Sequence, residues 1–214
     1  MKIRVFKTPS LIKKIFPKFV WDIKTEINEI ALTFDDGPIP ELTPYILDLL
    51  KEHKRKATFF CVGENIKKYP HIAQRIISEG HAIGNHTYNH LKGTKTSLSK
   101  YVENVEMFDE IYMKVLKQNS PKVFRPPYGL VQKSQSKNLR NRGYKIIMWD
   151  LLSYDFDRSV DSARALKKIT DKTSKGSVVL FHDNIKARQN LEYMLPRYLQ
   201  TLDNKKIRSD YTFK

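Results

Sequence analysis

The sequence predicts an α/β fold in one domain, with mainly parallel strands. Apolar, strand-like runs alternate along the chain with amphipathic helical segments, which is the pattern of successive βαβ units. The chain has 214 residues and is 40% hydrophobic, enough to bury one sizeable core, and single α/β barrels of this length are common. The acidic, basic and imidazole side chains that could carry out chemistry stand at or just beyond the ends of the predicted strands. Barrel enzymes assemble their sites at those ends.

Six apolar runs are expected to form the strands: residues 29–34, 57–62, 81–84, 122–125, 144–149 and 177–181. The segments between them have helical periodicity: residues 43–52, 72–79, 99–118, 132–141, 162–170 and 191–201. Gly80 and Gly143 stand just beyond two of these helices, where glycine commonly ends a helix. No internal repeat or linker interrupts the pattern, so a single domain is expected.

The chain is strongly basic, with 39 Lys and Arg against 23 Asp and Glu and a formal charge of +16. Such an excess favours contact with polyanions, whether nucleic acid, anionic lipid or an acidic cell-wall polymer. The lysines are scattered, and zinc-finger spacing and an aromatic RNA-binding pattern are missing, so no specific nucleic-acid partner is expected. Cys61 is the only cysteine, which excludes an intramolecular disulfide, and its apolar neighbours predict a buried thiol.

The N-terminal segment leaves location open. Its first basic residues resemble the start of a secretory signal, but charged residues and a proline interrupt the apolar region that should follow: Lys13, Lys14, Pro17 and Lys18. No run of about 18 apolar residues predicts a spanning helix. The apolar side chains between the lysines are expected to pack on the body of the fold, with peripheral contact with an anionic membrane as the alternative: Leu11, Ile12, Ile15, Phe16 and Phe19. The protein is therefore expected in the cytoplasm or at the periphery of the cell envelope.

Two short polar motifs predict a metal site. Asp35 and Asp36 directly follow the first predicted strand, and adjacent carboxylates repel each other unless a cation lies beside them. Successive strand side chains point in opposite directions, so the two carboxylates are not expected to share one task. His86 and His90, at positions i and i+4, would lie on one face of a helical turn and converge on one ion. One aspartate and two histidines are the three protein ligands of an open metal site.

Each motif taken alone has a plainer interpretation. An Asp-Asp-Gly sequence is usually a turn, and a spaced histidine pair is more often a solvated helix face. An arginine before two prolines could be a rigid loop, and His182 with Asp183 could cap a helix. Three histidines that match no motif are interpreted as structural: His53, His71 and His81. Trp149 is interpreted as core packing, with Asp150 close enough to the site to support it.

The motifs together resemble a known family. Five segments match, in order, the motifs of the polysaccharide deacetylases, also called carbohydrate esterase family 4 or the NodB-homology domain: Thr33-Phe34-Asp35-Asp36-Gly37, His86-Thr87-Tyr88-Asn89-His90, Arg125-Pro126-Pro127-Tyr128-Gly129, Ser153-Tyr154-Asp155-Phe156 and Leu180-Phe181-His182-Asp183. The resemblance covers residues 29 to 199 and implies a distorted (β/α) barrel with fewer complete strands than the eight-stranded form. It divides the chain into an N-terminal extension packed on the barrel (1–28), a catalytic domain (29–205) and a C-terminal tail (206–214).

The resemblance also implies a role for each site residue. The metal ligands would be Asp36, His86 and His90. Asp35 would be the general base, paired with Arg125, and His182 the general acid, paired with Asp155. The oxyanion and substrate-binding residues would be Tyr128, through its backbone N–H, Pro127, Phe156 and Leu180, with the last two lining the acetyl pocket.

The function implied is that of a metal-dependent hydrolase that removes N-acetyl groups from N-acetylglucosamine-containing glycans and releases acetate. Peptidoglycan and chitin-like oligomers are the expected substrates. One divalent ion is expected, with Zn²⁺ preferred over Co²⁺, Ni²⁺ or Mn²⁺. The alternatives are a glycan- or polyanion-binding protein with little activity, and an O-acetyl esterase acting on xylan-like polymers. Phe156 and Leu91 stand where the family commonly has Trp and Pro, which bears on substrate choice more than on catalysis.

Overall fold

The structure, a computed structural model, describes residues 4–214, and Lys2 of the basic start lies outside them. One seven-stranded sheet has the order β5-β4-β3-β2-β1-β7-β6, and every strand pairing in it is parallel. The strands are β1 (Ala31–Asp35), β2 (Ala57–Cys61), β3 (Ala82–Asn85), β4 (Val123–Phe124), β5 (Lys145–Ile146), β6 (Leu151–Leu152) and β7 (Val178–His182). The predicted α/β class with parallel strands is confirmed.

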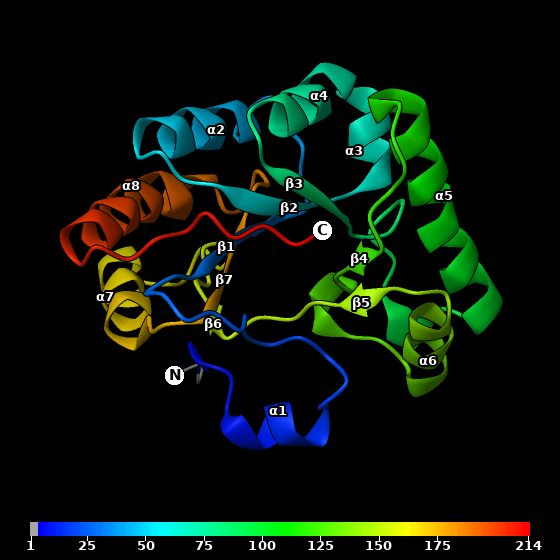
Figure 1. Cartoon of the computed structure of the whole chain (residues 1–214), viewed down its shortest axis with the longest axis horizontal. Coiled ribbons are helices and arrows are strands. Elements are labelled where there is room, and N and C mark those ends of the chain that lie inside the picture. The colour runs from blue at the N-terminus through cyan, green and yellow to red at the C-terminus, as the bar shows by residue number, and fades with distance from the viewer. Residues whose placement is uncertain (1–3) are drawn as a thin grey trace.

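Helices surround the curled sheet (Figure 1). They are α1 (Ser10–Ile15), α2 (Thr43–Glu52), α3 (Gly63–Lys68), α4 (Pro70–Ser78), α5 (Leu98–Leu116), α6 (Lys133–Asn141), α7 (Ser162–Lys172) and α8 (Arg188–Asn204), with short 3₁₀ turns at Gly93–Lys95 and Pro127–Gly129. Every predicted helix is present. Helices α1 and α3 and strand β6 were not predicted, because six or fewer residues show too little periodicity to indicate an element.

The central strands carry the core. Phe34 of β1 is fully buried, and its ring centroid lies 5.0 Å from that of Phe59 and 6.1 Å from that of Phe181, on the two neighbouring strands. Cys61 at the end of β2 is also fully buried, and burial raises the pKa of its thiol. The predicted buried thiol is confirmed. Because these strands are packed in the core, they fix the positions of the polar residues that follow their C-terminal ends.

The predicted strand 144–149 is shorter than expected, because the sheet has a seam there. Strand β5 ends at Ile146, and residues 147–150 cross to β6 at the opposite edge of the sheet. The N-terminal segment covers this seam: Met148 N–H donates to the Val20 carbonyl at 2.7 Å, and Thr8 N–H donates to the Asp150 carbonyl at 2.7 Å. An open edge presents unpaired backbone groups, and this segment supplies partners for them.

Asp150 belongs to that seam and not to the polar site. Its side chain is 1% exposed, receives a hydrogen bond from Lys13 Nζ at 2.6 Å and accepts another from Ser177 Oγ at 2.7 Å. Asp150 therefore has no direct place in the cavity. Its carboxylate instead fixes the N-terminal segment, because a buried charge requires a charged or hydrogen-bonding partner.

The C-terminal segment fills the end of the barrel at which the strands begin. Phe213 is 4% exposed, packs against Phe60 and Val178, and donates its backbone N–H to Thr58 Oγ1 at 2.9 Å. Figure 1 places the C-terminus among the strands. The boundaries at residues 28 and 205 stay predictions, although both flanking segments have buried contacts with the sheet.

All three apolar side chains of helix α1 are exposed, as is the adjoining Phe16, so the expectation that they pack on the body of the fold is wrong for these four: Leu11, Ile12, Ile15 and Phe16. Phe19, by contrast, packs against the buried cluster around Trp21. Residues 4–214 include no helix long and apolar enough to cross a membrane. Peripheral contact of α1 with an anionic surface stays a prediction.

Replacing Phe213 with alanine tests whether the C-terminal segment is part of the fold. The variant loses a buried ring inside the barrel, so the free energy of unfolding should fall by about 3 kcal/mol. Urea denaturation followed by circular dichroism measures it. Leu11→Ala is the control, since Leu11 is 65% exposed and its loss should change the stability by less than about 0.5 kcal/mol. Equal stability of Phe213→Ala and the parent would show that the segment only rests on the barrel.

Candidate metal and catalytic site

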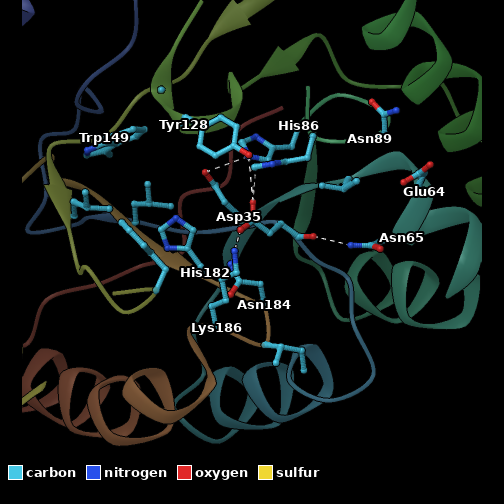
Figure 2. A pocket seen from close by; sticks show the side chains of 18 residues that line it. Asp35, Glu64, Asn65, His86, Asn89, Tyr128, Trp149, His182, Asn184 and Lys186 are labelled. Carbon is cyan, nitrogen blue, oxygen red and sulfur yellow. Dashed lines mark hydrogen bonds and ion pairs between the residues drawn. The ribbon is translucent and has the colours of Figure 1, made fainter. Parts of the chain in front are cut away.

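A cavity of about 540 Å³ opens at the C-terminal ends of the strands. Acidic and imidazole side chains lie at its centre, with polar residues of α3 and the following loops on one side and apolar residues on the other (Figure 2). Asp35, Asp36, His86, His90 and His182 all line it, although they come from three distant parts of the sequence. Parallel strands bring their carboxyl ends to one edge of a sheet, which is why these segments meet.

The backbone turns sharply between the two aspartates. Strand β1 ends at Asp35, and Asp36 has a φ of 90°, a value that few residues other than glycine adopt. Its N–H donates to the Phe60 carbonyl at 3.2 Å, and its own carbonyl accepts from Asn65 Nδ2 at 2.8 Å. Alternation along a strand therefore does not apply to this pair, and both carboxylates face the cavity with different partners.

Asp183 holds the other end of this turn. Its carboxylate accepts from the Gly37 N–H at 2.9 Å and from Thr43 Oγ1 at 2.7 Å. A Cβ at Gly37 would lie 1.8 Å from Asp183 Oδ2, so only glycine fits there. Burial raises the pKa of Asp183 to about 8, although the two hydrogen bonds work in the opposite direction.

Asp36, His86 and His90 form a cluster whose ligand atoms all lie within 4.8 Å of one another. Asp36 Oδ1 is 3.4 Å from His86 Nε2 and 3.1 Å from His90 Nε2. Burial opposes ionisation of Asp36, but hydrogen bonds from His86 and His90 and the charge of His182 outweigh it and hold the pKa well below its usual range. An ionised carboxylate with two imidazole nitrogens directed at one point is a donor set that suits a divalent transition metal.

His86 is oriented by a backbone carbonyl. Its Nδ1 lies 2.7 Å from the carbonyl oxygen of Arg125, so Nδ1 carries the proton and Nε2 presents its lone pair to the cluster. Metal-binding histidines are commonly held in this way, because the second nitrogen fixes both the tautomer and the plane of the ring. The residues present therefore fit a divalent ion.

The two histidines do not lie on a helix, contrary to the sequence prediction. Residues 86–90 form an irregular loop in which Thr87 and His90 have φ values of 66° and 59°. Asn85 Oδ1 accepts from the Thr87 N–H at 2.8 Å, and Asn104 Oδ1 accepts from the Tyr88 N–H at 2.9 Å. The left-handed backbone at Thr87 and His90 interrupts any helical turn, and the two asparagine oxygens satisfy N–H groups of the loop, so the imidazoles converge on one point without a helix.

Asp35 is paired with a fully buried arginine, as predicted from the resemblance. Arg125 Nη1 donates to Asp35 Oδ1 at 2.7 Å and to Thr33 Oγ1 at 2.9 Å. Burial lowers the pKa of Arg125, while the charge of Asp35 and its hydrogen bond work to raise it. The other carboxylate oxygen, Oδ2, lies 3.9 Å from His86 Nε2, which leaves Asp35 beside the metal cluster but outside it.

His182 and Asp155 form the second predicted pair. His182 Nδ1 lies 2.8 Å from Asp155 Oδ1, and the His182 N–H donates to Asp155 Oδ2 at 2.7 Å. Burial alone would lower the pKa of His182, but the charge and hydrogen bond of Asp155 and the charges of Asp36 and Asp35 raise it to about 9. The imidazole therefore holds its proton at neutral pH, and it lines the cavity in register with Asp35 of the neighbouring strand.

Three of the four predicted substrate-binding residues line the cavity, and Pro127 does not. Tyr128 is 61% exposed with a φ of 61°, and within residues 4–214 no hydrogen bond leaves its backbone N–H. Phe156 and Leu180 line the cavity, with the Phe156 ring centroid 4.8 Å from that of His182. Pro127 is buried and does not line the cavity, so the structure gives it no direct place in substrate binding.

Several cavity residues were not predicted. Trp149, interpreted from the sequence as core packing, lines the apolar side together with Leu152. Asn184 donates from Nδ2 to Asp36 Oδ2 at 2.5 Å, so only Oδ1 of that carboxylate faces the two histidines. Asn184 follows the fifth motif directly, and that position was the one indication in the sequence that it lies near the site.

Comparisons with known proteins agree with this geometry. The family model of polysaccharide deacetylases matches residues 22–147. Two peptidoglycan-N-acetylglucosamine deacetylases of Bacillus cereus are similar to the chain: one is 42% identical over 72% of this chain and 55% of its own length, and another is 33% identical over 85% of each. The solved structure of a peptidoglycan N-acetylglucosamine deacetylase in complex with 4-naphthalen-1-yl-N-oxidanyl-benzamide superposes with a TM-score of 0.85 at 34% identity, covering 94% of each chain.

The chain belongs to the polysaccharide deacetylase family, and the family resemblance and barrel type inferred from the motifs are confirmed. It spans about half, 55%, of the length of the first of these relatives. Membership establishes the fold and the class of protein. The roles of individual residues rest on the geometry described above.

Removing one histidine from the cluster should abolish tight metal binding. His90→Ala takes away one of the three expected protein ligands, so the affinity for Zn²⁺ should fall at least about 100-fold, since even changes in supporting residues cost about 10- to 100-fold. Competition with a chromophoric chelator measures the affinity. His71→Ala, on the exposed side of α4, is the matched control and should bind like the parent. Unchanged affinity in His90→Ala would place the metal elsewhere.

Proposed function

We propose that the protein is a metal-dependent hydrolase that removes N-acetyl groups from N-acetylglucosamine units of a glycan and releases acetate. The observation that carries the proposal is the placement of an aspartate and an imidazole, each held by a partner of opposite charge, beside one metal-binding cluster. Asp35, held by Arg125, and His182, held by Asp155, stand in register at the ends of the neighbouring strands β1 and β7, and both line the cavity. A hydrolysis that needs a base and an acid in turn requires this arrangement.

The ligands would be Asp36, His86 and His90, and Zn²⁺ suits one carboxylate with two imidazoles. When bound, such an ion acts as a Lewis acid on the acyl oxygen and makes a water molecule more acidic. Asp35 accepts the proton of the attacking water. Arg125 fixes the direction of the carboxylate through a hydrogen bond of 2.7 Å from Nη1 to Oδ1.

The later steps use two other groups that line the cavity, Tyr128 and His182. The tetrahedral intermediate carries a negative oxygen, and the Tyr128 N–H is a free donor at the cavity wall that can stabilise it. The leaving nitrogen must be protonated before it departs, since an amine anion is too basic to leave near neutral pH. His182 holds that proton because Asp155 raises its pKa.

The acetyl methyl group needs an apolar wall, and the cavity supplies one from four side chains: Trp149, Leu152, Phe156 and Leu180. The amide is preferred over an ester because a protonated imidazole is required for an amine leaving group and less so for an alcohol. The names of the relatives, peptidoglycan-N-acetylglucosamine deacetylases, support peptidoglycan as the substrate. A binding protein without activity would need none of the proton-transfer pairs, and the chain keeps both.

The experiment that tests the proposal is acetate release by zinc-reconstituted protein from peptidoglycan and from neutral N-acetylglucosamine oligomers, with a chelated sample beside it. Release that is lost on chelation and restored by Zn²⁺ supports the proposal. Tight zinc binding without acetate release from either substrate would contradict it.

Asp35→Asn should lower kcat by about 10²- to 10⁴-fold, the usual contribution of a general base. The substitution keeps the shape of the side chain and leaves the three metal ligands in place, so zinc stoichiometry should not change. The measurement is steady-state acetate release with zinc content determined on the same sample. Asp171→Asn, exposed on α7, is the matched control. Retention of more than a third of the parent kcat would exclude Asp35 as the base.

The pH dependence should report His182. The acid form exists below its pKa of about 9 and is lost above it, so the activity should decline as the pH rises through this region. Asp155→Asn removes a charge and a charge-assisted hydrogen bond that raise the pKa, so the alkaline limb of kcat/KM should move to lower pH by about one to three units. A limb that stays in place or moves to higher pH would show that another group sets it.

A further inference from the structure

A second hollow adjoins the catalytic cavity. It has a volume of about 460 Å³ and is lined by Arg158, Ile185, Lys186, Arg188, Gln189 and Glu192. Ile185 and Lys186 line both spaces, so the hollow continues the catalytic cavity along the loop after β7. Figure 2 shows Lys186 beside Asn184, below the imidazole of His182. A glycan long enough to extend from the reacting sugar in this direction would enter it.

The hollow has an excess of positive charge. Three of its side chains are cationic and only Glu192 is acidic, and Glu192 is already paired with Arg188 at 2.8 Å. Among residues 4–214, no carboxylate lies within 4.0 Å of the charged groups of Arg158 or Lys186. These two cations are therefore available to a ligand, and they flank the path by which substrate would leave the reacting centre.

The opposite side of the catalytic cavity differs in charge. Its polar residues there are Glu64, Asn65 and Asn89, which offer one negative and two neutral side chains. Figure 2 places them across the site from Lys186. The two ends of the cavity would thus receive chemically different parts of a substrate, with the anionic part at Arg158 and Lys186.

We propose that Arg158 and Lys186, with Arg188 beside them, form a subsite for the carboxylate groups of peptidoglycan. In peptidoglycan, the sugar next to N-acetylglucosamine carries a lactyl carboxyl group, free or extended by a peptide stem that itself bears carboxylates. Chitin-like oligomers have no anionic group at any position. This inference rests on the proposed deacetylase function and deepens it, since it makes the cationic hollow the feature that selects peptidoglycan over a neutral glycan.

The selection would act through two exposed cations. Exposed ion pairs are weak, so their combined effect should be a preference of about fivefold in kcat/KM and not an absolute requirement. It should also weaken as salt rises from roughly 0.05 to 0.5 M, because solvent-exposed charges are screened over that range. A preference based on shape alone would be insensitive to salt.

The test is the double variant Arg158→Gln/Lys186→Gln in the zinc-loaded full chain. The measured quantity is the ratio of kcat/KM for soluble peptidoglycan fragments to kcat/KM for neutral N-acetylglucosamine oligomers, and it should fall about fivefold. The matched control is Arg164→Gln/Lys168→Gln on α7, which removes the same charge from an exposed surface outside both hollows. Its ratio should equal that of the parent.

Two results would overturn the inference. One is an unchanged ratio in Arg158→Gln/Lys186→Gln, and the other is an equal fall in the control, which would assign the preference to the overall charge of +16. Calorimetric binding of a peptidoglycan tetrasaccharide and of a neutral tetrasaccharide gives a second readout that needs no turnover. If the parent released no acetate at all, the proposed function would fail, while the difference in binding between parent and variant would still decide whether the subsite exists.

Discussion

The buried guanidinium of Arg125 is the constraint on which the site depends. It is fully buried, and its donors bind the Asp35 carboxylate and the backbone carbonyls of Ile147 and Met148. Its own carbonyl orients His86. An unpaired charge at this depth would be strongly destabilising, so the end of β1 and the chain that leaves β5 must approach it closely. The same requirement that stabilises the barrel therefore places the proposed base and one metal ligand.

Each of the two proposed proton-transfer groups in the cavity has a partner of opposite charge. Arg125 holds the carboxylate of Asp35, and Asp155 favours the protonated form of His182 on the neighbouring strand. The carboxylate of Asp36 also acts on His182 through its charge, and its second oxygen is held by Asn184. Groups whose environments separate their protonation states in this way can give and take a proton in one cycle without a change in pH. The fold achieves this separation with residues from the ends of different strands.

The sequence predicted the parts of this arrangement that depend on local patterns. Every regular helix longer than six residues was predicted from periodicity, and Asp35, Asp36, His86, Arg125 and His182 were placed correctly at or just beyond strand ends. The contacts that link distant segments could not be predicted, because Asn184 and Asp36 are 148 positions apart and nothing in either segment indicates their approach. The histidine loop was predicted as a helix because its spacing fits one. In the structure, the side chains of Asn85 and Asn104 bind N–H groups of this segment and hold it as an irregular loop.

The seam of the barrel explains why the flanking segments matter to the site. An incomplete barrel leaves the edges at β5 and β6 open, and the loop between them carries Met148 and Trp149. Met148 accepts the Arg125 hydrogen bond through its carbonyl and donates its N–H to Val20, while Trp149 lines the cavity. The N-terminal segment thus supports, from outside the barrel, the same loop that Arg125 binds from inside. The stability of this edge and the geometry of the apolar wall therefore depend on the same contacts. A change at the seam should alter the shape of the cavity.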